Sequence, residues 1–224
     1  MKKELILTAL LAGLTPSFGV LNVALPGLSQ RSSWEDLNSS NYPTSSGYNS
    51  FFTNTAGWST PISADVGSVT FDKVAGGGGY PASTSIYNFD TPGSFFISAS
   101  SPISGLETVV FQIDMVGAIS GGPTLSYNGG AQELAADISE NMSGNFAFGG
   151  SPSTINAYQW DLSAIGVTIS DFTIEWDSIA HSASFAMQLD SGNAFEGTVI
   201  PEPSTYALIF GVASGLLLMR RMRR

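Results

Sequence analysis

The sequence predicts an all-β domain, an antiparallel β-sandwich of the jelly-roll or lectin-like type. Apolar and polar residues alternate with a period of two in several runs between residues 20 and 196, as in strands with one buried face. The chain also holds 25 glycines and 11 prolines, which suits many short turns. No stretch before Tyr206 has a sustained helical period, and residues 131–138 are expected to form a turn or two of helix at most.

Nine short strands account for the alternation. In the clearest run, Phe172, Ile174 and Trp176 share one face and the residues between them are polar or acidic. In another run, Gln112 and Asp114 oppose a face of four apolar residues. The predicted strands are residues 68–74, 84–90, 94–99, 109–115, 124–127, 146–148, 156–162, 171–177 and 183–190.

Composition excludes several classes of function. The chain has no cysteine, which excludes disulfides, cysteine-ligated zinc, iron–sulfur clusters, a thiol nucleophile and a lipidated cysteine. The formal net charge is −10, and between residues 20 and 200 only Arg31 and Lys73 are basic against 16 acidic residues. Because such a surface cannot neutralise phosphates, we expect no nucleic-acid partner. With so few cations, stability must come from apolar burial and backbone hydrogen bonds.

The N-terminus has the pattern of a secretory signal peptide over residues 1–19. Lys2 and Lys3 precede an apolar run over residues 5–14, and Pro16 is followed by the small residues Ser17 and Gly19. These small residues suit a cut before Val20, although a cut after Ala24 fits the sequence as well. The expected partners are the Sec translocon and signal peptidase. The alternative is a buried N-terminal helix of the domain.

The C-terminus combines a tether, an apolar segment and a basic tail. Residues 197–203 contain Pro201, Glu202 and Pro203, and two prolines so close together enforce an extended chain. Residues 204–219 predict a short transmembrane helix. Its apolar stretch, residues 206–219, would be roughly 21 Å long as a helix, against the ~30 Å of a bilayer core. The tail, residues 220–224, should stay cytoplasmic and leave the domain outside. Its basic residues are Arg220, Arg221, Arg223 and Arg224.

This C-terminal arrangement resembles the PEP-CTERM sorting signal of exported bacterial proteins. Pro201, Glu202 and Pro203 match its motif, and the apolar segment and the arginine tail follow in the same order. The resemblance covers the last 26 residues. It implies processing by an exosortase, followed by release or attachment at the cell surface, often alongside exopolysaccharide. A plain tail anchor is the alternative, whereas a terminal arginine cluster contradicts a GPI signal.

The sharpest polar feature of the predicted domain is a row of carboxylates on one strand face. Asp171, Glu175 and Asp177 alternate with apolar residues, so Glu175 and Asp177 lie roughly 7 Å apart. Such a row could donate oxygen ligands to calcium or flank a sugar as a glycosidase pair does. It could equally be a solvated outer face. No other cofactor is expected.

The remaining candidates are one histidine, one glycine run and one aromatic-rich segment. His181, the chain's single histidine, follows a predicted strand and should lie in a hairpin turn. The four glycines of residues 76–79 are expected to form a flexible hairpin tip, since no Lys-Ser or Lys-Thr follows them. Residues 29–61 are expected to form ordered loops over one sheet. Their rings could stack on sugars or pack in the core, and they are Trp34, Tyr42, Tyr48, Phe51, Phe52 and Trp58.

These features predict an exported, non-enzymatic bacterial protein of the cell surface or extracellular matrix. Its precursor would be anchored in the inner membrane, and its mature form would lie at the surface or outside the cell. One alternative is a carbohydrate-binding module associated with exopolysaccharide. Another is a secreted glycan-acting hydrolase that uses Glu175 and Asp177.

Overall fold

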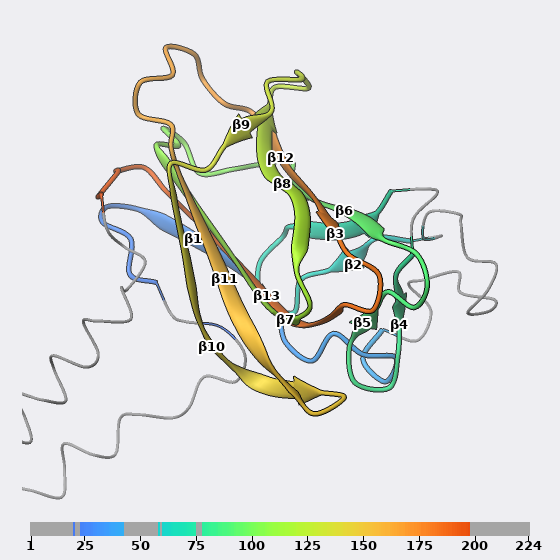
Figure 1. Cartoon of the computed structure of the whole chain (residues 1–224). Helices are drawn as coiled ribbons and strands as arrows, with labels where there is room; N and C mark the ends of the chain where they lie inside the picture. Colours follow the sequence, from blue (N-terminus) through green and yellow to red (C-terminus); the bar gives the residue numbers. More distant parts are fainter. Residues whose placement is uncertain (1–19, 21–22, 43–57, 59, 75–77, 198–224) are drawn as a thin grey trace, which may run out of the picture.

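The computed structural model describes residues 20, 23–42, 58, 60–74 and 78–197 (Figure 1). This part of the chain contains thirteen strands in two antiparallel sheets and no helix, so the predicted all-β class is confirmed. The expected signal helix and C-terminal membrane helix lie outside the described residues. Within the described ranges, no helix has the length and apolar character that crossing a membrane requires.

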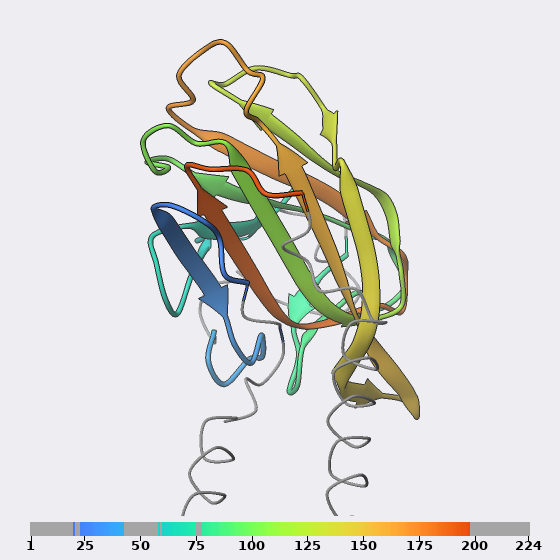
Figure 2. The ribbon, with the colours of Figure 1, turned by 90° about the vertical axis from the view of Figure 1, so that its left-hand side faces the viewer.

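The first sheet has seven strands in the order β10-β11-β7-β13-β5-β4, and β1 also pairs with β13. Figure 2 shows its five long strands side by side, from β1 through β13, β7 and β11 to β10. The bounds are β1 Ser29–Trp34, β4 Tyr80–Pro81, β5 Ile86–Tyr87, β7 Thr108–Val116, β10 Ile138–Phe148, β11 Ser151–Asp161 and β13 Ala183–Gly192.

The second sheet has six strands in the order β2-β3-β6-β12-β8-β9. Its bounds are β2 Ile62–Ser63, β3 Thr70–Lys73, β6 Gly93–Ala99, β8 Ile119–Tyr127, β9 Leu134–Ala135 and β12 Phe172–Ser178. Across both sheets the antiparallel pairs are nested along the chain: β1 pairs with β13, β6 with β12, β7 with β11, and β8 with β9. The first and last strands of the domain are therefore neighbours.

The core lies between the two sheets and is rich in aromatic rings. Phe71 stacks on Trp176 with ring centroids 5.7 Å apart, and Phe111 lies 5.0 Å from the same tryptophan. The predicted faces of β12 are confirmed, because its apolar residues are buried and Glu175 and Asp177 are exposed. Burial of these aromatic surfaces, together with the aliphatic residues of the same cluster, stabilises a chain with so few cations.

Two strand predictions and one helical expectation need correction. Residues 84–90 contribute only the short β5, because Asn88 leaves the sheet and donates from Nδ2 to Ser182 Oγ at 2.8 Å. Residues 146–148 are the end of the eleven-residue β10, whose exposed polar residues hide its alternation. Residues 131–138 contain no helical turn: Leu134 and Ala135 form β9, and Ile138 begins β10.

Residues 29–61 were expected to be loops, but residues 29–34 form β1 along β13. The sequence conceals this strand because its first residues are polar and exposed, and only Ser32, Ser33 and Trp34 are buried. Of the rest of this segment, the structure describes residues 35–42, 58, 60 and 61.

The outer face of the first sheet is also largely buried. Gln112, Asp114, Gln188 and Asp190 all point away from the core and are at most 3% exposed. Over one end of this face lies the N-terminal segment, whose Val23 forms a small apolar cluster with Val110 and Ala157. In β7 and β13, therefore, the face that carries the polar residues is buried and does not face solvent.

Candidate functional site

The predicted sorting residues lie outside the described part of the chain. These are Pro201, Glu202, Pro203, Arg220, Arg221, Arg223 and Arg224, and the signal peptide, residues 1–19, also lies outside. The structure shows instead how the two ends of the domain meet. Leu28 N donates to Asn193 Oδ1 at 2.8 Å, and Asn193 N donates to Leu28 O at 3.1 Å. The segments that lead to both predicted membrane signals therefore leave the sandwich side by side (Figure 1).

Both terminal segments are fastened to the first sheet. Arg31, on β1, donates from Nη2 to Val23 O at 3.1 Å and from Nε to Asp190 Oδ1 at 2.9 Å. At the other end, Gln159 Nε2 donates to Glu196 O at 2.9 Å. The ordered domain thus extends to the residue before the expected tether, which begins at residue 197.

Of the three predicted calcium candidates, Asp171 lies just before β12, and Glu175 and Asp177 lie on its exposed face. They do not form a cluster. Asp171 accepts hydrogen bonds from Gly129 N at 3.0 Å and Ser170 Oγ at 2.8 Å, and Asp177 accepts one from Ser94 Oγ at 2.5 Å. Among the described residues, no three acidic or imidazole side chains converge where a metal ion could bind. Asp171 and Glu175 do line a shallow cavity of about 220 Å³ on the second sheet.

His181 lies in a turn, as predicted, but the turn is not a hairpin. It joins β12 of the second sheet to β13 of the first, and the residue has a left-handed backbone with φ of 59°. Its ring Nδ1 lies 3.2 Å from the Tyr87 hydroxyl, so its partner there is a phenol rather than the carboxylate of a catalytic triad.

The glycine run is also a connection between sheets and not a hairpin tip. It leads from β3 to β4, and only Gly78 and Gly79 of the four are described. Gly79 has a φ of 103°, and a Cβ there would lie 2.7 Å from the Phe95 ring. Close packing under a positive φ therefore requires glycine at this position.

The described aromatic residues of the segment 29–61 serve the core and cannot stack on a sugar. Trp34, Tyr42 and Trp58 are at most 8% exposed and belong to the main apolar cluster. Their polar atoms are also engaged: the two indoles donate to backbone carbonyls, and the Tyr42 hydroxyl donates to Asp65 Oδ1 at 2.8 Å. Tyr48, Phe51 and Phe52 lie outside the described residues.

The structure contains an aromatic site that the sequence did not suggest. We call it the Tyr87 groove, an open cavity of about 530 Å³. It is lined by Ser39, Tyr80, Pro81, Ala82, Ser83, Thr84, Tyr87 and Phe148. The Tyr87 and Phe148 rings lie 5.0 Å apart at 41°, and both are half-buried. No local pattern signals this groove, because its lining comes from three segments that are distant in the chain.

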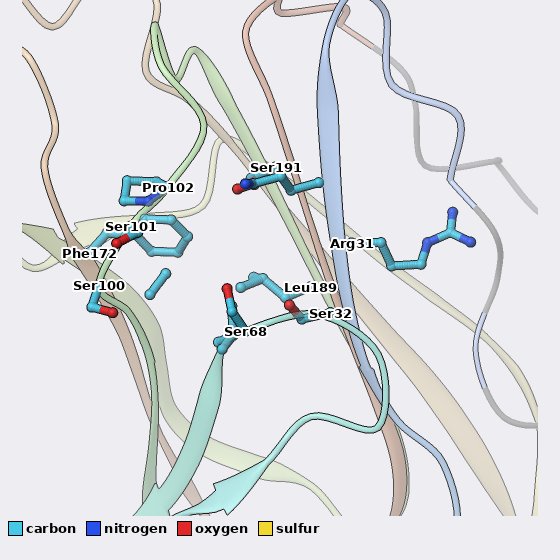
Figure 3. Close-up of a pocket in the computed structure, with 13 residues that line it drawn as sticks. Arg31, Ser32, Ser68, Ser100, Ser101, Pro102, Phe172, Leu189 and Ser191 are labelled. Atoms are coloured by element: carbon cyan, nitrogen blue, oxygen red, sulfur yellow. The ribbon is translucent and has the colours of Figure 1, made fainter.

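A second cavity lies between the sheets and is lined mainly by serines and apolar side chains (Figure 3). Its volume is about 120 Å³, below the ~300–1,000 Å³ of typical small-molecule sites. Arg31 points away from it, so no charged side chain enters it. The Tyr87 groove is therefore the better candidate for a binding site.

Comparison with protein-family models, with curated proteins and with solved structures finds no match to this chain.

Proposed function

We propose that this chain is an exported bacterial protein of the cell surface or extracellular matrix, sorted by a PEP-CTERM-like signal and without enzymatic activity. The observation that carries the proposal is the adjacency of the two domain ends, held by the Leu28–Asn193 hydrogen bonds. A signal peptide and a C-terminal helix attached there would enter the membrane from one side of the domain. The whole sandwich would then project outside during sorting.

The strand order supports the finer architecture, a jelly roll. In that fold eight strands pair as nested hairpins, first with last and so on inward, and wrap into two facing sheets. The four nested pairs of this chain follow that scheme, and β2, β3, β4, β5 and β10 add to the sheet edges. A fold that brings its first and last strands together suits a cargo with a membrane signal at each end.

Support for a non-enzymatic role comes from the polar side chains themselves. His181 contacts Tyr87, while Asp171 and Asp177 accept hydrogen bonds from neighbouring loop and strand groups. These contacts hold turns and strand ends in place. The expected partners are the Sec translocon, signal peptidase, an exosortase and surface glycan.

The sorting proposal is tested by replacing Pro201, Glu202 and Pro203 together with alanine in a bacterium that has an exosortase. We expect the variant to accumulate as a membrane-bound precursor of greater mass than the processed wild type, because the motif for cleavage is lost. Cell fractionation and mass spectrometry of the intact protein measure this. The matched control replaces the adjacent Ser204 and Thr205 with alanine and should be processed normally. Normal processing of the motif variant would refute recognition by an exosortase.

A further inference from the structure

We propose that the Tyr87 groove binds an uncharged glycan, with one sugar ring lying against Tyr87 and Phe148. The inference rests on the proposed function only for the surface location where the protein would meet its ligand. The binding site itself is inferred from the groove. The rings that surround the groove lie outside the main core cluster. Tyr80 is buried, but Tyr87 and Phe148 are only half-buried, although burying them fully would stabilise the fold, so the partial exposure of these two rings needs another explanation.

The ring of Tyr87 is held in one orientation before any ligand arrives. Tyr80 packs against it edge to face at 6.0 Å, and Phe89 does so at 6.2 Å. Its hydroxyl lies 3.2 Å from His181 Nδ1, and the His181 turn is itself fixed by hydrogen bonds to Asn88. A surface that is already rigid loses little entropy on binding.

Phe148 reaches the groove from the end of β10, just before the β10–β11 turn. Its neighbour on the same side of that strand, Phe146, stacks on Phe185 at 4.8 Å and 10°. This second contact packs the end of β10 against Phe185 of β13. Two flat rings from separate elements thus stand 5.0 Å apart at the groove.

The chemistry of the lining favours a sugar. A pyranose has an apolar C–H face and a rim of hydroxyls, and a ring–ring contact with that face leaves the hydroxyls free for hydrogen bonds. The groove offers aromatic rings at its wall and the hydroxyls of Ser39, Ser83 and Thr84 around them. Its volume of about 530 Å³ falls within the range of small-ligand sites.

The charge of the groove and of the whole domain favours a neutral glycan over an acidic one. None of the residues that line the groove is charged, so nothing there would pair with a uronate or sulfate. The residues between 20 and 200 carry a formal charge of −14, which repels polyanions. The groove therefore fits an uncharged polysaccharide.

The test uses the full chain, purified in a polyoxyethylene detergent because sugar-headed detergents would compete for the site. Native gels containing laminarin, hydroxyethyl cellulose or galactomannan, and alginate as the acidic counterpart, measure retardation. We expect at least one neutral polymer to slow migration and alginate not to. Tyr87→Ala and Phe148→Ala should each weaken that binding by about tenfold or more, whereas Tyr87→Phe should keep most of it.

The matched control is Phe96→Ala, which removes another half-buried phenylalanine, on β6 of the second sheet. It should bind like the wild type. Thermal unfolding identifies any variant that has lost its fold. Of the variants, Phe148→Ala should disturb the fold least, because Phe148 lies beside the β10–β11 turn. Absence of retardation by all three neutral polymers, retardation by alginate alone, or equal loss in Phe96→Ala and Phe148→Ala would overturn the proposal. Such a result would leave processing at Pro201–Pro203 intact, so the two proposals fail separately.

Discussion

At the scale of the residue, Arg31 of β1 connects β13 of the first sheet to the N-terminal segment. Its guanidinium binds the Asp190 carboxylate and the Val23 carbonyl, and Gln188 Nε2 donates to the second oxygen of Asp190 at 2.6 Å. Burial raises the pKa of Asp190, although the hydrogen bonds from Gln188 and Arg31 act in the opposite direction. Removal of Arg31 would therefore leave a buried carboxylate with weaker compensation.

We predict that Arg31→Met lowers the free energy of unfolding by about 2 kcal/mol, or roughly 4–8 °C in unfolding temperature. The loss should be larger at pH 7 than at pH 4. A folded-state pKa above the unfolded value means that the native state binds protons more readily, so stability rises as the pH falls towards the unfolded pKa. Circular dichroism melts at both pH values measure this. Asp190→Asn added to Arg31→Met should restore most of the loss, and an equal loss at both pH values would contradict the explanation.

At the scale of the element, the N-terminal segment behaves as part of the fold. Val23 is 6% exposed, packs on Val110 and Ala157, and holds Arg31 through its carbonyl. Leu25 also packs on this cluster. The sequence allowed a signal-peptidase cut before Val20 or after Ala24, and these two cuts differ in whether Val23 remains.

We predict that the mature chain begins at Val20, and intact-mass measurement of the exported protein checks this. A chain that begins at Leu25 lacks the buried Val23 side chain, whose burial is worth about 1.5–3 kcal/mol, and should unfold several degrees lower. The exposed Ala24 provides the control, since Ala24→Ser should leave the melt unchanged while Val23→Ala lowers it. The prediction would be contradicted by an exported protein that begins at Leu25 and melts at the same temperature as a chain that begins at Val20.

At the scale of the whole molecule, the nested pairing closes the domain on itself. β1 and β13 run antiparallel from Ser29 opposite Gly192 to Trp34 opposite Met187. The described ends of the domain therefore lie close together. In the β10–β11 turn, a Cβ added at Gly149 or Gly150 would have no atom within 4 Å. A circular permutation is tolerated when the original ends of a domain are adjacent and the new ends are placed in an exposed turn.

We predict that a permutant of residues 20–197 folds when residue 197 is joined to residue 20 by a short glycine-serine linker and the new ends lie between Gly149 and Gly150. Its circular dichroism spectrum and cooperative melt should match those of the unpermuted domain. A control opened between Gln112 and Ile113, inside the central β7, should fail to fold because it breaks two ladders. If the permutant opened between Gly149 and Gly150 fails to fold, that result contradicts the adjacency of the domain ends.

Local sequence was sufficient for some parts of this domain and insufficient for others. β12 could be predicted because Phe172, Ile174 and Trp176 alternate with residues that face solvent. β1 and β10 could not be delimited, because their exposed positions are short polar residues that also suit loops. Among the predicted site residues, Glu175 and Asp177 share an exposed face of β12 as expected. No spacing rule, however, shows that Asp171 accepts a hydrogen bond from Gly129 or that Asp177 accepts one from Ser94 on β6.

The sequence by itself determined the all-β class, the acidic and cysteine-free composition, and the placement of an export-like pattern at each end. These follow from residue type and local period, which do not depend on the rest of the chain. Only the tertiary structure decided which strands pair, that the polar side of β7 and β13 is buried, and that Tyr80, Tyr87 and Phe148 meet. The physical reason is that strand pairing and surface grooves depend on contacts between distant segments, whereas alternation reports only that one face of a strand is buried.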